Sequence, residues 1–182
     1  MRKTDARIRY TQGVLKQALL SFLQEKPINK ITVKEVCERA ELNRATFYAH
    51  YSDCFALLES IEEDLLEAFQ QSLKLVASFD VTALIEAIYT MIEQQQEACR
   101  VLIFQNVCPN VLRRMISLAR DKSIAYWKQH LHRVTEAELE MLYTHLSNGL
   151  MHVVVEGYEK YSREEVVRFV NRIVQCSLSQ FQ

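Results

Sequence analysis

The chain has 182 residues, of which 49% are hydrophobic and 25% are charged, and its formal net charge is −1. This composition predicts a soluble globular protein with one good core or two small ones. Only three glycines and two prolines occur, which excludes a Gly-rich phosphate loop and predicts an all-α fold of about nine helices.

A first helix is expected over residues 4–25, before Lys26-Pro27. Apolar residues recur there at helical spacing and are expected to form one buried stripe. The members of this stripe are Ile8, Leu15, Leu19 and Phe22. In a helix-turn-helix domain, such a helix supplies the third wall of the core.

The pattern most informative about function lies in residues 32–58. Thr32 and Glu35 are spaced as a capping box, in which a hydroxyl and a carboxylate bind the first backbone N–H groups of a helix. The helical pattern then breaks after residue 40, and Asn43 is suited to cap a second short helix that begins at Arg44. The sequence therefore predicts a helix-turn-helix followed by a long helix.

The side chains of the second short helix divide into two sets. Phe47 and Tyr51 are four residues apart and are expected to join Val36, Ala40 and Leu42 in a small core. The other set is expected to face outward, with chemical groups that suit base edges and phosphates. Its members are Arg44, Thr46, Tyr48 and His50.

This segment resembles the signature of the TetR family of transcriptional regulators, in the branch that carries a TFYxHYxD run. The matching residues are Thr32, Val36, Ala40, Leu42, Thr46, Tyr48, His50 and Tyr51. The resemblance implies a three-helix DNA-binding head over residues 1–51 and a helical effector-binding and dimerisation body over residues 52–182. It also implies a set of DNA-binding residues, namely Thr32, Lys34, Asn43, Arg44, Ala45, Thr46, Tyr48 and His50.

Two residues depart from the family pattern. Glu41 stands where a turn glycine is usual, so the turn must take a conformation that a non-glycine residue can bear. Cys54 stands where a lysine usually meets a phosphate, and backbone N–H groups beyond Ser52 are expected to replace part of that contact. A thiol at a helix start can also act as a redox switch, although a structural cysteine is the simpler interpretation.

Six more helices are expected after the helix-turn-helix, over residues 52–77, 81–96, 98–106, 109–132, 135–157 and 162–181. The first of these is expected to carry Phe55, Leu58, Leu65, Phe69 and Val76 along one side. Capping boxes at Thr135 and Ser162 open the last two helices. Both are apolar over a wide arc, so we expect them to pair with a second copy in a two-fold four-helix bundle. Burial of both helices inside a monomer stays open as the alternative.

Charge is unevenly distributed along the chain. Residues 1–51 carry ten Lys and Arg against five Asp and Glu, a balance of +5, whereas the remainder has a balance of −6. Attraction to phosphate is local and falls off within about 10 Å at ordinary salt. The basic end can therefore bind DNA although the whole chain is slightly acidic.

Five scattered cysteines without a CxxC pair are typical of a protein in a reducing cytosol. Neither a signal peptide nor a membrane span is expected, so we predict a cytoplasmic location. His130 and His132 cannot share a helix face, and His152 with Glu156 is an isolated pair. We therefore expect no metal, no cofactor and no enzymatic activity.

The family resemblance also implies a small apolar or aromatic effector bound among the helices of the body. Candidate lining residues are Tyr89, Phe104, Tyr126, Trp127 and His130, although such aromatics are more often plain core. We expect a homodimeric repressor of a palindromic operator whose DNA affinity is altered by the effector. Two alternatives stay open: a helix-turn-helix regulator, activators included, controlled by a protein partner, and an all-helical enzyme.

Overall fold

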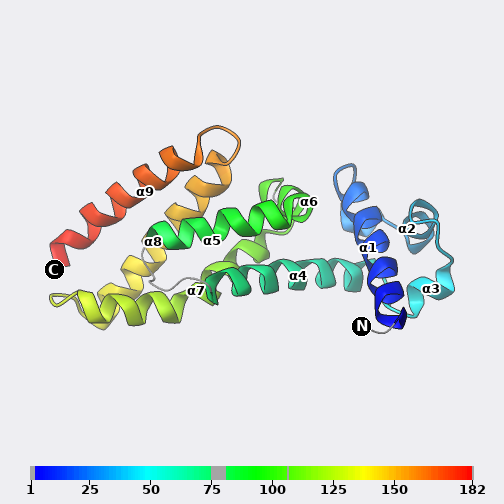
Figure 1. Cartoon of the computed structure of the whole chain (residues 1–182), viewed down its shortest axis with the longest axis horizontal. Helices are drawn as coiled ribbons and strands as arrows, with labels where there is room; N and C mark the ends of the chain where they lie inside the picture. Colours follow the sequence, from blue (N-terminus) through cyan, green and yellow to red (C-terminus); the bar gives the residue numbers. More distant parts are fainter. Residues whose placement is uncertain (1–2, 75–80, 106, 182) are drawn as a thin grey trace. The chain divides into compact units, whose positions relative to one another are not determined.

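The computed structural model describes residues 3–74, 81–105 and 107–181. Within these ranges all regular structure is helical and nine α-helices are present, which confirms the predicted all-α fold (Figure 1). None of the helices in these ranges is both long and apolar enough to cross a membrane.

The chain forms two compact units. The first consists of Met1–Leu65 with Glu97–Val107, and the second of Leu66–Gln96 with Cys108–Gln182. Helix α4 (Cys54–Lys74) contributes residues to both units. The boundary predicted after residue 51 divides a DNA-binding role from an effector-binding and dimerisation role. Compact units do not test a division of roles, so this boundary stays a prediction.

The first unit contains the helices predicted for the N-terminal end. Its elements are α1 (Lys3–Leu23), the 3₁₀ turn η1 (Ile28–Lys30), α2 (Val33–Arg39), α3 (Arg44–Tyr48), the start of α4, the end of α6 (Gln96–Ala98) and the π-helix η2 (Cys99–Phe104). Side chains without exposed surface form its centre and include Leu15, Leu19, Val36, Phe47 and Leu57. Helices α1 to α4 therefore share one core.

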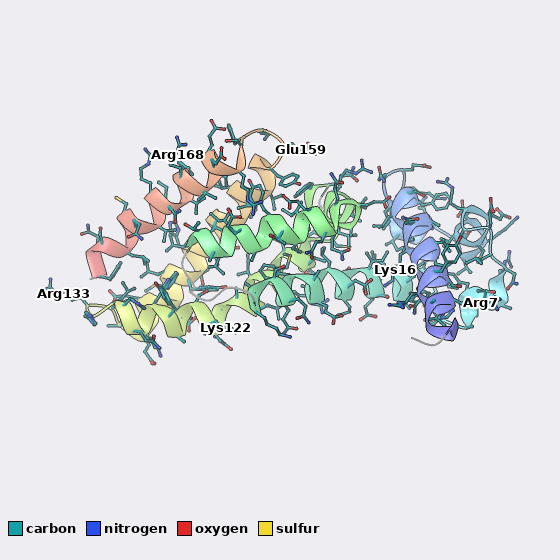
Figure 2. The ribbon with its side chains drawn as sticks, viewed as in Figure 1. Arg7, Lys16, Lys122, Arg133, Glu159 and Arg168 are labelled. Carbon is teal, nitrogen blue, oxygen red and sulfur yellow. The ribbon has the colours of Figure 1, made fainter. Side chains whose placement is uncertain are left out.

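Helix α1 enters this core only from Thr11 onward. Residues 6–10 are all exposed, and Ile8, which was expected in the buried stripe, is 39% exposed. That prediction was wrong, because the described side chains of α1 become buried only from Thr11 onward. Farther along, Lys16 holds α1 to α4, with its Nζ 2.5 Å from Asp64 Oδ2 (Figure 2).

The buried side of α4 is rotated from the expected one at its start. Cys54, Leu57 and Leu58 are buried, whereas Phe55 is 57% exposed. Because each residue of an α-helix turns by about 100°, Phe55 cannot share the face of its neighbour Cys54. The prediction held for Leu58, Leu65 and Phe69, which are all buried, and Val76 lies outside the described residues.

A π-helix replaces most of the α-helix expected over residues 98–106. Helix α6 ends at Ala98, and η2 follows over Cys99–Phe104 with a bond from Gln105 N–H to Arg100 O at 3.0 Å. Four of the six residues of η2 are buried, namely Cys99, Val101, Leu102 and Ile103. The i→i+5 bonding of a π-helix holds more residues per turn than an α-helix does.

The second unit is a bundle of long helices. Its elements are α5 (Val81–Gln94), α7 (Pro109–His130), α8 (Glu136–Gly157), α9 (Arg163–Leu178), the 3₁₀ turn η3 (Ser179–Phe181) and the end of α4. Both predicted capping boxes are present, at Thr135 with Glu138 and at Ser162 with Glu165. They fix the starts of α8 and α9 at the positions expected from the sequence.

Two sets of polar contacts join these helices. Antiparallel α7 and α8 are linked by a bidentate pair of Arg120 with Glu140. Arg163, at the first residue of α9, bridges to Glu86 and Glu93 of α5. Helix α9 therefore packs on α5 as well as on α8 (Figure 1).

Candidate nucleic-acid interface

The turn between α2 and α3 is a Schellman motif. Leu42 N–H donates to Cys37 O at 2.9 Å, and Glu41 N–H donates to Glu38 O at 3.3 Å, which are the two bonds of that motif. Glu41 has a φ of 54°, the left-handed conformation that favours glycine. The turn thus keeps the geometry of a glycine turn although a glutamate occupies it.

Helix α3 is held at its start by Asn43 and along its length by Phe47. Asn43 Oδ1 accepts the backbone N–H of Thr46 at 2.7 Å and the Thr46 hydroxyl at 3.0 Å, which confirms the predicted cap. Since the amide oxygen is used in this way, the NH₂ group of Asn43 is the end left for a phosphate. Phe47 is fully buried and packs 5.9 Å from the Tyr51 ring, so the rotation of α3 about its axis is fixed.

The predicted DNA-facing residues of α3 are presented at the surface. Arg44 and Ala45 are exposed, and Thr46 and His50 are half-buried. Tyr48 is 58% exposed, and its ring meets Phe47 edge to face at 5.7 Å. Within the part of the chain that the structure describes, no carboxylate pairs with the Arg44 guanidinium. The surface of α3 therefore presents the guanidinium of Arg44, the phenol of Tyr48 and the imidazole of His50.

Thr32 and Lys34, the two residues predicted to bind DNA at the start of α2, differ in the interactions that they already make within the chain. The hydroxyl of Thr32 accepts from Glu35 N–H at 3.3 Å and donates to Glu35 Oε2 at 2.8 Å. Lys34 is exposed and lies 3.8 Å from Glu38 Oε1 in a surface pair, an interaction of small energy. Lys34 is therefore available to a phosphate, whereas Thr32 must give up a hydrogen bond to reach one.

A backbone N–H group at the start of α4 is already bonded by the side chain of Asp53, the residue that precedes the helix. Asp53 Oδ1 accepts Ala56 N–H at 2.8 Å, so the expected phosphate contact from these N–H groups competes with a carboxylate. Cys54 is buried, and this burial, with the nearby Asp53 charge, raises the pKa of its thiol to about 11. A redox-switch cysteine requires a lowered pKa and exposure, and Cys54 has neither.

Comparisons with known proteins identify the fold to which this helix-turn-helix belongs. No family model matches the chain. Over 62 residues, 34% of the chain, the sequence is 37% identical to the uncharacterized HTH-type transcriptional regulator YxbF of Bacillus subtilis (strain 168), and the match spans 16% of that protein. The structure of a TetR transcriptional regulator from Streptococcus agalactiae 2603V is similar with a TM-score of 0.67, at 22% identity, over 94% of this chain and 97% of that chain. The chain has the TetR-family fold.

Two further structures with similar folds extend the TetR comparison. One is the TetR-family transcriptional regulator PfmR from Thermus thermophilus, with a TM-score of 0.60 and 13% identity over 91% of this chain and 93% of that chain. The other is DhaS, described as an activator of a dihydroxyacetone kinase operon, with a TM-score of 0.65 and 16% identity over 94% and 98%. The TetR resemblance predicted from residues 32–58 is therefore confirmed and extends, as a fold, over most of the chain. The individual DNA contacts stay predictions.

The five residues predicted to line an effector pocket of the TetR type are not brought together. Trp127 lines a partly open cavity of the second unit. Tyr126 and His130 stack on one another at 4.1 Å, and His130 is exposed. Tyr89 packs against Tyr158 and beneath the Arg163 guanidinium, and Phe104 belongs to the first unit.

Several residues that line the Trp127 cavity carry no signal in the sequence. They include Tyr143, Leu146, Ser147 and Met151 of α8. Periodicity identifies the apolar side of α8 but not which part of it faces a gap, because that depends on the register between α7 and α8. Asp53, which caps the start of α4, does carry a signal in the sequence. A polar pair before an apolar run predicts a helix cap.

Proposed function

We propose that this chain is a DNA-binding transcriptional regulator of the TetR type that represses from a palindromic operator as a homodimer and responds to a small effector. The observation that carries the proposal is the exposed edge of α3. Arg44, Ala45 and Tyr48 are exposed there on a helix fixed by the Asn43 cap and the buried Phe47. A short, rigidly held helix with an unpaired guanidinium at its start suits a guanine in the major groove.

The homodimer is supported by the surface of α8 and α9. Phe169 and Ile173 of α9 are each 44% exposed, and Met141 of α8 is 63% exposed. Grooves of about 490 Å³ and about 200 Å³ lie along these two helices. The smaller groove is lined mainly by apolar side chains of both helices. Exposed apolar surface of this kind marks interaction sites, and a two-fold axis would place the same surface against itself.

A second candidate function keeps the DNA-binding head but places it under the control of a protein partner. It is favoured by the size of the Trp127 cavity, about 60 Å³, against roughly 300–1,000 Å³ for typical ligand pockets. The similar fold of DhaS, described as an operon activator, leaves activation open for this candidate. A small molecule that changes operator affinity in purified components would exclude it.

The proposed function is tested by selecting genomic DNA with the full-length protein and measuring binding to the selected sequence. A palindromic sequence bound by two copies of the chain is expected, with half-sites about one helical turn or more apart. Arg44→Ala is expected to weaken binding by about 1–3 kcal/mol and to relax specificity at one base pair. Lys34→Ala is expected to weaken all sequences alike and to lower the salt slope by about 1.

The matched control is Arg133→Ala, which removes an exposed arginine from the loop between α7 and α8 (Figure 2). This control is expected to leave affinity and specificity unchanged. If Arg44→Ala binds the selected sequence as tightly and as specifically as the unmodified protein does, α3 is not the recognition helix and the proposal fails.

A further inference from the structure

The smaller of the two grooves along α8 and α9, here named the His145 groove, contains one ionisable side chain. Residues His145, Gly149 and Val153 of α8 line it together with Phe169 and Ile173 of α9. None of the described residues that line it is Asp, Glu, Lys or Arg, and His145 is the one side chain among them that changes charge near neutral pH. The lining is therefore uncharged whenever His145 is neutral.

His145 is exposed in the single chain, so water can hydrate its charged form. Gly149, four residues further along α8, is also exposed, and a β-carbon added to it would meet no atom within 4 Å. A glycine on a helix face allows another chain to approach the backbone closely. Residues four apart lie on the same helix face, so close approach at Gly149 would also remove water from His145.

A second copy of this chain is the occupant that the His145 groove suits. A two-fold axis places a face against itself, so each charge on that face meets a like charge and is repelled. The described lining of the His145 groove has no permanently charged side chain, so neutral copies can meet there without that repulsion. Phe169 and Ile173 are each 44% exposed beside it and provide apolar surface for the contact to bury.

The charged groups around His145 do not favour its protonated form. No residue three or four positions away on α8 is charged. No described residue of α7 lines the groove, and the ion pair between α7 and α8, Arg120 with Glu140, lies five residues before His145. On α9, Arg168 and Arg172 are adjacent in sequence to lining residues, but both are exposed and line neither groove. Their positive charge also opposes protonation of a nearby imidazole.

His152 provides a comparison on the same helix. It is exposed, and it lines the larger groove together with Glu156, Lys160 and Glu165. Two carboxylates beside one ammonium group favour the charged form of an imidazole. Covering the larger groove would therefore leave a protonated His152 with possible partners, whereas covering the His145 groove would leave a protonated His145 with none from the described lining.

We infer that pH controls the pairing of two copies through His145, which permits the contact when neutral and opposes it when protonated. This regulation rests on the dimer of the proposed function. Removal from water disfavours an imidazolium that gains no carboxylate, so a protonated His145 must release its proton before the groove is covered. Pairing is therefore at full strength above the ordinary histidine midpoint of about pH 6.5 and weakens as the pH falls below it. Since the proposed operator contact needs two copies, acid would release the operator.

Proton linkage sets the size of the effect. Each copy releases up to one proton on pairing, so the dissociation constant of the dimer depends on the square of the total-to-neutral ratio of that histidine. For a histidine of ordinary midpoint, this ratio is about 1.1 at about pH 7.5 and about 11 at about pH 5.5. The dimer is therefore expected to dissociate about 100-fold more readily at the lower pH.

Sedimentation equilibrium of the full-length protein measures this constant at the two pH values and one ionic strength. A thiol reductant is included because Cys176 is exposed. His145→Gln has a side chain that stays uncharged, and it should hold the constant within about threefold over the same range. His145→Leu should do the same, so a packing defect in one variant does not decide the result. The matched control is His152→Gln, which should keep the hundredfold change.

A dimer of the unmodified protein that is as tight at about pH 5.5 as at about pH 7.5 would overturn the inference, and this comparison needs no variant. The hundredfold change persisting in both His145 variants, or disappearing in His152→Gln, would overturn the assignment to His145. A flat pH profile with an intact dimer removes the pH control alone. A chain that stays monomeric at both pH values removes the homodimer of the proposed function.

Discussion

Replacing Glu41 by glycine is expected to stabilise the helix-turn-helix. Glu41 has a φ of 54° in the Schellman turn after α2, and a residue with a β-carbon pays about 1–2 kcal/mol for that conformation. Glycine avoids this cost but gives up roughly 0.4–1 kcal/mol because its unfolded chain is more flexible. Subtracting the second term from the first leaves a net gain of about 0 to 1.6 kcal/mol, with a central value of about 0.8 kcal/mol.

Thermal unfolding followed by far-UV circular dichroism measures this gain. The first unit has 76 residues, and for a domain of that size 1 kcal/mol corresponds to about 4–8 °C in Tm. Glu41→Gly should therefore raise the transition of the first unit by about 3–6 °C. Trp127 lies in the second unit, so its fluorescence should show no comparable shift if the two units unfold separately.

Glu41→Ala is the matched control, because alanine removes the same carboxylate but keeps the β-carbon and its strain. The difference between the glycine and alanine variants isolates the backbone conformation from the charge. A glycine variant no more stable than the alanine variant would refute the reasoning, since relief of strain must appear in that difference.

Two further predictions concern titratable groups in the first unit. Hydrogen bonds from Lys26 and Thr32 lower the pKa of Glu35 to about 2 from an ordinary 4.5, so its contribution to stability is complete above pH 4.5 and is lost as the pH falls toward 2. Urea unfolding at stepped pH should show this loss, Glu35→Gln should abolish that part of it, and Glu38→Gln should not. Cys54 is buried with a pKa of about 11 while Cys176 is exposed, so iodoacetamide should modify Cys176 first in the folded protein, as read by mass spectrometry. Equal rates at the two thiols would contradict the placement of Cys54.

The helix starts were predictable because capping is local. Thr32, Thr135 and Ser162 each bind the backbone three residues ahead, so the signal and its effect lie within one turn. Asn43 follows the same rule at α3. These caps, together with the buried Phe47, place the candidate DNA-binding face from sequence pattern alone.

Exposure and cavity lining were less predictable because they depend on which helix lies opposite. Ile8 and Phe55 fit an apolar period, yet they are 39% and 57% exposed. Tyr126 and Trp127 are adjacent in sequence, but of the two Trp127 lines the cavity. Such outcomes depend on contacts between helices distant in sequence, which periodicity does not encode.

The π-helix at Cys99–Phe104 also affects how this chain should be aligned with other sequences. A turn closed by i→i+5 bonds contains one residue more than the α-helical turn it replaces. A relative whose helix is regular at this point is therefore expected to be one residue shorter between Gln96 and Gln105. An alignment that omits this gap would pair every following residue of the segment with a position about 100° round the helix, and would assign buried positions such as Leu102 to the solvent face.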